Sequence, residues 1–355
     1  MKLNKLLLTA IAGSLFFVSC SDDDNNNDAP QGTYDNGVFI LNQGGFLAGN
    51  ASVSFNSDAL LSTDVYGSNN PGLTLGDTGQ DIGLEGDYAY IVVNYSNKIE
   101  VVNRYSFQHV ATIEDGLENP RYIAFEGGKA YVTNWGLGSD TTDDYVAIIN
   151  LATNEVTNTI PVAEGPERII EEDGNLYVAH KGGWNFGNTI TVINGHTNTV
   201  TTTITVGDLP DSLEIENGNL YVLNSGLPYY ADAETPGSLS VINLATNTVT
   251  STLSFTTGQH PAYLVEDNNT FYYTLGNEIY SMPVTATSLP TAALFNVDGE
   301  GVTSLYAFAV NNGKVYVADA GDYTSNGDVY IYSLSGTLTS SFSVGVAPAG
   351  FYFNN

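Results

Sequence analysis

Hydrophobic and polar residues alternate along the chain with the two-residue period of β-strands, and the alternation recurs in hairpin-sized units. Each unit has a strand, a Gly, Asn or Asp turn, and a second strand with an aromatic residue near its start, most often followed by valine. Asn-Gly and Asp-Gly pairs are strong signals for tight hairpins. The pattern therefore predicts six β-hairpins, at residues 79–93, 120–134, 166–180, 210–224, 261–275 and 305–319.

A seventh unit is divided between the two ends of the chain. "PAGFYFNN" (348–355) supplies its first strand and "NGVFILN" (36–42) its second. If the ends are joined, Phe39 falls at the position that an aromatic occupies in every other unit. These seven hairpin aromatics recur every 41 to 51 residues, and they are Phe39, Tyr90, Tyr131, Tyr177, Tyr221, Tyr272 and Tyr316.

Between hairpins lie two more strand-like runs, as in "TITVINGHTNTVTTTITVG", so each unit has four strands. Seven such units predict an all-β fold over residues 36–355, a seven-bladed β-propeller whose closing blade is shared between the N- and C-termini. Sharing a blade closes the ring without an unpaired edge. A parallel β-helix is the alternative, but its coils are shorter and it has no need of a divided repeat. The content of 23 Tyr and 37 Gly with 14% charged residues also favours strands and turns.

The N-terminus has the features of an exported protein. Lys2 and Lys5 precede the apolar run "LLLTAIAGSLFFV", and "FVSC" follows. We expect residues 1–19 to be a lipoprotein signal peptide and Cys20 to be the lipidated first residue of the mature chain. An uncleaved signal anchor with an incidental cysteine is the alternative. Cys20 is the only cysteine, which excludes an intrachain disulfide and a four-cysteine zinc site.

Residues 20–35 are expected to form an acidic disordered tether, because "SDDDNNNDAPQG" cannot build a core. An acidic run after a lipidated cysteine resembles the export signal of surface lipoproteins in one group of Gram-negative bacteria. This implies an outer-membrane, cell-surface location; a spacer facing the periplasm is the alternative. The mature chain has seven Lys and Arg against 39 Asp and Glu, hence a net charge of −32. Such a surface disfavours nucleic acid, and membrane contact is expected only through the lipid anchor.

The candidate binding residues lie in the loops after the second strand of each hairpin and in the connections between blades, which share one face of a propeller. These loops differ from blade to blade, whereas the hairpin turns are uniform, and variable loops on a rigid scaffold often carry function. They hold both tryptophans and several of the few cations. The alternative is that the aromatics pack loops and the cations pair with neighbours such as Glu167 and Asp81. The predicted ligand-binding set is Asn94, Arg121, Asn134, Trp135, Arg168, His180, Lys181, Trp184, Asn224, Tyr229, Tyr230 and His260.

Catalytic and metal signatures are missing from the sequence. It has no G-x-S-x-G elbow, H-E-x-x-H motif, P-loop or haem attachment motif. "SDTTDDY" offers Asp140, Asp143 and Asp144, but the spacing of an EF-hand is absent, and a solvated loop is the favoured interpretation over calcium binding. We therefore expect a protein that is not an enzyme, with no cofactor, although a site assembled from distant blades stays an alternative.

Short sequence matches add a family resemblance. "YVTN", "YVAH", "YVLN" and "YVAD", with "VINLATNTVTSTL", resemble the YVTN-repeat propellers across residues 36–355. "FILNQGGFLAGNASVSF", "LGDTGQDI" and "YIVVNYSNKIEVV" resemble the start of a lipoprotein subgroup, some of whose members sit on TonB-dependent transporters and capture cobalamin. The resemblance implies a lipid-anchored capture protein for outer-membrane nutrient uptake, with cobalamin as the leading ligand and a TonB-dependent transporter as partner. A protein-interaction propeller, or a propeller lyase or dehydrogenase, are the alternatives.

Overall fold

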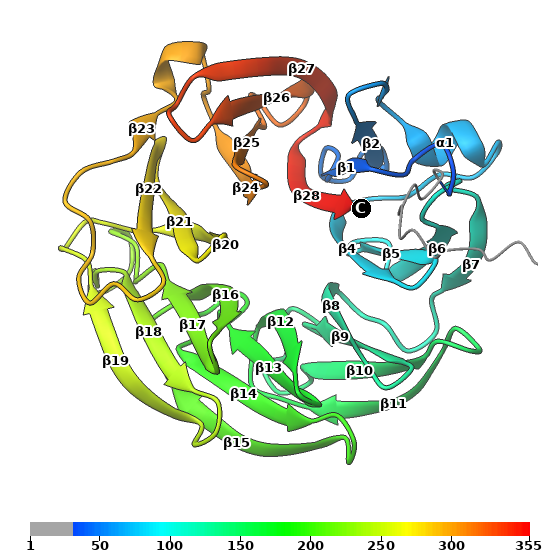
Figure 1. Cartoon of the computed structure of the whole chain (residues 1–355). Coiled ribbons are helices and arrows are strands. Elements are labelled where there is room, and N and C mark those ends of the chain that lie inside the picture. Colours follow the sequence, from blue (N-terminus) through cyan, green and yellow to red (C-terminus); the bar gives the residue numbers. More distant parts are fainter. Residues whose placement is uncertain (1–30) are drawn as a thin grey trace, which may run out of the picture.

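The computed structural model describes residues 31–355, which form seven four-stranded antiparallel sheets arranged in a ring (Figure 1). This confirms the predicted seven-bladed propeller. The expected signal peptide, Cys20 and residues 20–30 of the expected tether lie outside the described residues. Within residues 31–355, no helix is long and apolar enough to cross a membrane.

Each blade runs from an inner strand beside the central channel to an outer strand. Blade 1 is β28 (Pro348–Asn354), β1 (Gly37–Asn42), β2 (Ser52–Asn56) and β3 (Leu61–Ser62); blade 2 is β4 (Gly79–Glu85), β5 (Tyr88–Val93), β6 (Lys98–Asn103) and β7 (His109–Ile113). Blade 3 is β8 (Pro120–Glu126), β9 (Lys129–Asn134), β10 (Tyr145–Asn150) and β11 (Glu155–Pro161); blade 4 is β12 (Pro166–Glu172), β13 (Asn175–His180), β14 (Thr189–Asn194) and β15 (Thr199–Thr205). Blade 5 is β16 (Pro210–Glu216), β17 (Asn219–Asn224), β18 (Ser238–Asn243) and β19 (Thr248–Ser254); blade 6 is β20 (Ala262–Asp267), β21 (Thr270–Leu275), β22 (Glu278–Pro283) and β23 (Phe295–Asn296). Blade 7 is β24 (Leu305–Asn311), β25 (Lys314–Asp319), β26 (Asn326–Ser333) and β27 (Leu338–Val346); the two short helices are α1 (Val65–Asn69) and η1 (Asp298–Glu300).

The ring closes through the divided blade, as the sequence predicted. β28 pairs with β1 in antiparallel register, with Phe39 opposite Tyr352 (red beside dark blue in Figure 1). Asn354, which is fully buried, donates hydrogen bonds from its amide to the backbone oxygens of Tyr34 and Arg104. The last strand is therefore tied both to its own blade and to the start of the described chain.

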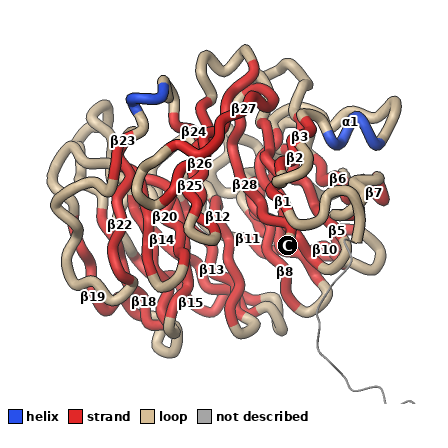
Figure 2. The backbone as a smooth tube through the Cα atoms, turned by 45° about the horizontal axis from the view of Figure 1, so that its top comes forward, coloured by secondary structure: helices blue, strands red, loops and turns tan. Residues whose placement is uncertain are grey.

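The tight hairpin turns all lie on one side of the ring, which we call the turn face. In five of them both central residues have positive φ, the type I′ geometry that matches the twist of paired strands. These turns are 127–128, 173–174, 217–218, 268–269 and 312–313, built from Gly, Asn and Asp. The loops at the opposite strand ends form the second side, which we call the loop face; Figure 2 shows the strands standing between the two sets of loops.

The hydrophobic core lies in the seams between blades. All seven hairpin aromatics are buried, with at most 9% of the side chain exposed. Tyr90 of blade 2 packs against Phe125 of blade 3, with ring centroids 5.3 Å apart, and Tyr221 of blade 5 packs against Phe271 of blade 6 at 4.6 Å. The repeated aromatic therefore seals each blade to its neighbour, which makes the ring a stiff scaffold for its loops.

Candidate functional site

Exposed aromatic side chains concentrate on the loop face. Among residues 31–355, eight aromatic side chains are well exposed, and seven of them stand in loops of this face. The eighth, Tyr88, lies beside a hairpin turn on the turn face. We call the seven the aromatic collar: Phe46, Tyr95, Trp184, Phe186, Tyr229, Tyr230 and Tyr323. Exposed aromatic surface costs solvation free energy, and its concentration on the loop face makes this face the candidate site.

Several collar residues are held in edge-on pairs. Phe46 of blade 1 meets Tyr95 of blade 2 with centroids 5.2 Å apart, and Tyr229 meets Tyr230 at 5.4 Å. Tyr229 is 83% exposed and Trp184 79%. Blade 6 adds nothing to the collar, because only two residues connect β21 to β22. The collar therefore spans blades 1, 2, 4, 5 and 7.

The two tryptophans were predicted from the sequence to have the same role, but the structure gives them different surroundings. Trp135 is half-buried: its indole N–H donates to the carbonyl of Pro166 at 3.1 Å, and the Arg121 guanidinium lies 4.2 Å from its ring centroid. Trp184 leans on Trp135 edge-on, at 6.5 Å between centroids, and lies close to Gly138, but most of its side chain is exposed. Trp135 thus holds the loop in place, whereas Trp184 is available to a ligand.

Acidic residues of blades 3 and 4 line a small hollow of about 50 Å³ between these two indoles. Burial, with the nearby charges of Asp143 and Glu164, raises the pKa of Asp144 to about 6, although the N–H of Gly165 donates to it. Asp140 instead accepts hydrogen bonds from Thr142, which lower its pKa. Among the described residues, no group of three or more acids, histidines or cysteines is placed to hold a metal ion.

Two of the predicted cations are neutralised at the loop-face mouth of the channel. Arg121 makes a bidentate ion pair with Glu167 of the next blade, both contacts being 2.8 Å, and Lys181 pairs with Asp211 at 2.8 Å. Burial favours the neutral form of Asp211, but the charge and hydrogen bond of Lys181 prevail and lower its pKa to about 2. Both cations thus make the ordinary ion pairs of the alternative interpretation, and their charge is largely balanced within the described residues.

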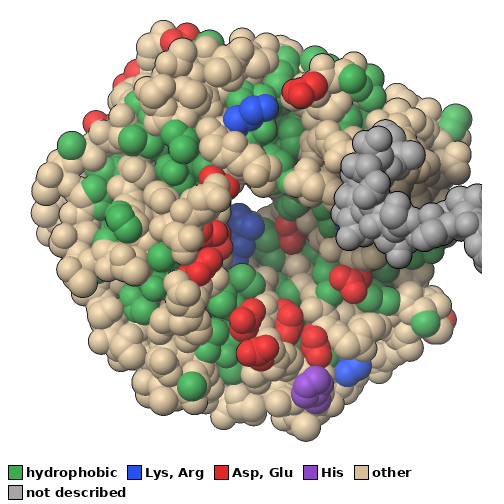
Figure 3. Space-filling view, viewed as in Figure 1, with side chains coloured by type: hydrophobic (Ala, Val, Ile, Leu, Met, Phe, Trp, Pro, Cys, Tyr) green, Lys and Arg blue, Asp and Glu red, His purple; other side chains and the backbone are tan. Residues whose placement is uncertain are grey.

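Arg168 differs from the other two. Within residues 31–355 its guanidinium makes no ion pair and no hydrogen bond; it lies over the Tyr122 ring, 4.2 Å from the centroid. It points into the channel that Figure 3 shows as a hollow at the centre of the ring, with basic and acidic side chains inside it.

Four of the five remaining predicted residues are buried. The Asn134 amide donates to the Val132 carbonyl at 2.8 Å, and its oxygen accepts from the N–H of Glu118; Asn94 donates to the Pro120 carbonyl. His180 is buried against Thr191, and this burial lowers its pKa to about 4. These polar groups bond within the scaffold and do not reach the exposed loop surface. The four buried residues are Asn94, Asn134, Asn224 and His180. His260 is partly exposed but bonded to the Ser225 carbonyl and the Glu234 carboxylate.

A regular feature of the sequence would have located the channel lining. The first residue after the opening position of each inner strand lies at the channel mouth, as Arg121, Glu167 and Asp211 do. The second residue points deeper, and it is Tyr122 in blade 3, Arg168 in blade 4 and Tyr263 in blade 6. The sequence analysis placed the arginines beside the channel but missed three other lining residues. Tyr122 and Tyr263 occupy the second position of their inner strands, and Glu214 lies two residues further along its strand.

Comparisons with known proteins agree with the architecture. A family model described as "Domain of unknown function (DUF5074)" matches residues 36–344. No curated protein matches the sequence. The model that matches is not one of YVTN repeats, so of the expected family resemblance only the seven-bladed propeller fold is confirmed.

Solved structures share the fold at low sequence identity. A quinonprotein alcohol dehydrogenase-like protein from Bacteroides thetaiotaomicron is 16% identical over 91% of this chain and 79% of that one, with a TM-score of 0.67. A functionally unknown protein from Desulfotomaculum acetoxidans is 12% identical over 90% and 98%, at 0.65. BamB from Moraxella catarrhalis is 13% identical over 90% and 86%, at 0.53. At these identities the likeness extends to the fold alone.

Proposed function

Because the chain belongs to the DUF5074 family, which is defined as a domain of unknown function, we propose a function from its geometry: it is a binding protein that captures a ligand on its loop face. The observation that carries this proposal is the aromatic collar. Seven of the eight well-exposed aromatics of residues 31–355 stand on one face, on loops that a stiff ring holds in place. Rigid aromatic side chains give binding energy at a low cost in conformational entropy.

The ligand that best suits this face is large and amphipathic. Trp184, Tyr229 and Tyr230 offer flat apolar area with indole and phenol groups at its edges. Cobalamin has matching chemistry, with a flat apolar corrin and a rim of amides, and it is also the ligand suggested by the sequence resemblance. We therefore propose cobalamin as the ligand, bound by the collar rather than by the buried asparagines or the paired cations.

Calorimetric titration of the purified full-length protein with cyanocobalamin tests the ligand. Trp184→Ala and Tyr229→Ala should each weaken binding by about 1–2 kcal/mol. Tyr88→Ala is the matched control, because it removes an exposed aromatic from the turn face; Lys314→Ala, on the same face, removes a charge. Neither control should change the affinity.

The outcomes separate the ligand from the surface. If cyanocobalamin gives no heat and does not co-elute with micromolar protein, the vitamin is the wrong ligand, and the collar is better explained as a docking surface for another protein. If it binds but the collar variants behave like Tyr88→Ala, the ligand is correct and the chosen surface is wrong.

The cellular role proposed with this function is capture for outer-membrane uptake, with the protein anchored through Cys20 and working with a TonB-dependent transporter. Cys20→Ser should leave the protein unlipidated and move it to the soluble fraction. Protease treatment of intact cells should remove the wild-type protein. If only lysed cells lose it, the cell-surface location is wrong and the anchored protein faces the periplasm.

A further inference from the structure

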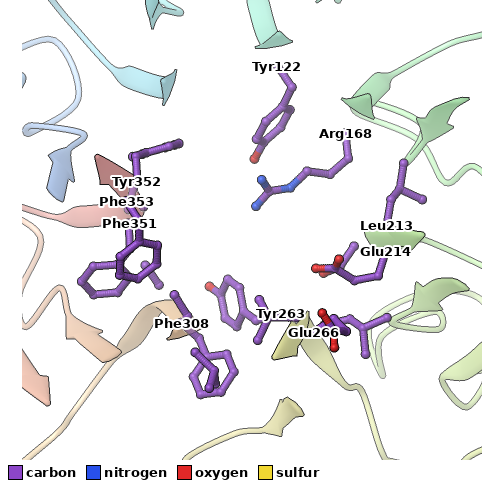
Figure 4. A pocket seen from close by; sticks show the side chains of 18 of the residues that line it. Tyr122, Arg168, Leu213, Glu214, Tyr263, Glu266, Phe308, Phe351, Tyr352 and Phe353 are labelled. Atoms are coloured by element: carbon purple, nitrogen blue, oxygen red, sulfur yellow. The ribbon is translucent and has the colours of Figure 1, made fainter. Parts of the chain in front are cut away.

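The central channel contains a cavity that is separate from the aromatic collar. It encloses about 280 Å³, and all seven inner strands contribute to its lining. Arg168 and Tyr122 lie together on one side of it, whereas Phe308, Phe351 and Phe353, from β24 and β28, lie on the other; Tyr263 also lines it (Figure 4). The cavity therefore has one cationic, hydrogen-bonding side and one apolar side. We propose that it is a second binding site, for a small organic monocarboxylate that carries an apolar group.

Arg168 is the group that would hold the carboxylate. A guanidinium presents five N–H donors in a planar fork that fits a carboxylate in bidentate fashion. None of these donors is used by the residues of the described chain, 31–355, and Figure 4 shows the guanidinium projecting into the cavity beside the Tyr122 ring. A partly buried cation without a bonded anion is costly, so the site favours a negatively charged ligand.

The nearest acids do not replace such a ligand. Asp81 already accepts hydrogen bonds at 3.0 Å from the N–H of Ile123 and from the Tyr352 hydroxyl. Asp211 is paired with Lys181. Both carboxylates act on Arg168 through space but form no ion pair with it. The charges of Asp81 and Asp211 thus favour the position of the Arg168 guanidinium, while its N–H donors stay available to a ligand.

The other side of the cavity restricts what the carboxylate can be attached to. Phe308 and Phe351 lie across the cavity from Arg168, and Leu264 and Val265 also line it. Burying an apolar group there removes it from water at about 25 cal/mol per Å². The carboxylate of Glu266 also lines the cavity, which disfavours a ligand of higher negative charge such as a phosphate ester. A single carboxylate on a hydrophobic body satisfies both sides.

Calorimetry of the full-length protein with phenylacetate as the probe tests this site, with 2-phenylethanol as the uncharged match and inorganic phosphate as the anion without an apolar group. We expect saturable binding of phenylacetate and none of the other two. Arg168→Gln should weaken binding by roughly tenfold or more, and Arg168→Lys, which keeps the charge but loses the fork, by less. Lys314→Gln, on the turn face, should bind as the wild type does. Circular dichroism melting checks that each variant is folded.

This site does not depend on the proposed function, and the two can fail separately. Trp184→Ala should leave phenylacetate affinity unchanged, and Arg168→Gln should leave collar binding unchanged. The proposal is overturned if phenylacetate does not bind at millimolar concentration. It is equally overturned if 2-phenylethanol binds as well, or if folded Arg168→Gln and Arg168→Lys both keep the wild-type affinity.

Discussion

The two faces of the propeller are built from the same strands but follow different rules. On the turn face, each connection within a hairpin is two residues long, and five of the six turns use positive φ at both central positions. On the loop face, the connection after the second strand of a blade ranges from two residues in blade 6 to the 13 residues 225–237 in blade 5. The backbone geometry is nearly the same in every hairpin of the turn face, whereas the loops of the loop face differ in length and in side chains.

This difference separates the parts of the molecule that hold the ring together from the parts that the proposed function uses. The turn face exposes one aromatic residue of the described chain and the loop face seven. Loops can diverge because the inter-blade aromatics and tight turns already define the ring. Substitutions on the turn face and at the ring closure should therefore change stability, whereas substitutions in the collar should change binding only.

The largest effect is expected where the turn face has no turn at all, at the divided blade. Deleting residues 349–355 removes all of β28 except Pro348, and β28 is the inner strand that pairs with β1. The loss should exceed about 5 kcal/mol, a large part of the stability of an ordinary domain, and should lower the melting temperature sharply or prevent folding. Removing Asn355 alone, which is exposed, is the control. A melting temperature that stays close to that of the full chain would refute the closure by the terminal strands.

A smaller effect is expected at a single turn. Gly218 has a φ of 72° and open space where a Cβ would stand, so Gly218→Ala is penalised by backbone strain alone. The cost should be about 1–2 kcal/mol in urea unfolding. Gly299 on the loop side also has open space but no positive φ, and Gly299→Ala should be nearly neutral. Equal effects of the two substitutions would show that the turns do not define the scaffold.

The channel between the faces predicts a pH effect. Burial, with the charge of Glu266, raises the pKa of Glu214 from 4.5 to about 8. Because the folded state holds this proton more tightly than the unfolded state, stability falls as pH rises from 4.5 through 8. Glu214→Gln should be more stable than the wild type at pH 9, because glutamine carries no charge to bury, and should lose that advantage at pH 4. The exposed Glu155→Gln should show no such change; a Glu214→Gln advantage that is the same at both pH values would contradict the burial of this acid.

The scaffold could be predicted from the sequence because its signals are local. Strand alternation, Asn-Gly and Asp-Gly turns and the evenly spaced aromatics led to seven blades and to the pairing of residues 348–355 with 36–42, which the structure confirms. The strand register also predicted which loops share a face, so the sequence places both tryptophans on the loop face, where the structure has them.

The roles of single residues on that face could not be predicted, because they depend on contacts between blades. Arg121 and Glu167 are neighbours only once blades 3 and 4 pack together. Trp135 and Trp184 look equivalent as sequence, yet the first is held by Pro166 and Arg121 and the second is exposed. Asn134 and Asn224 recur at one register of the repeat, and this regularity is itself a sign of a structural role that the interpretation overlooked.

The Trp184→Ala substitution is expected to have the smallest effect on stability. It is also the substitution that tells most about the collar as a binding surface. Trp184→Ala should change the free energy of unfolding by less than about 0.5 kcal/mol, because the side chain is 79% exposed. Tyr131→Ala, which empties a buried inter-blade position, should instead cost about 3–5 kcal/mol. A destabilised Trp184→Ala would mean that the collar is part of the scaffold and not a surface held ready for a ligand.

The most direct test of the central claim uses the fact that the protein has two tryptophans and that both stand on the loop face. In a Trp135→Phe variant, Trp184 is the only fluorophore of its kind, and the lifetime of its emission can be measured during acrylamide quenching with and without cyanocobalamin. If the ligand seats on the collar, saturating cyanocobalamin should lower the acrylamide quenching constant of Trp184 severalfold. A quenching constant unchanged by saturating cyanocobalamin would contradict the assignment of the loop face as its binding surface.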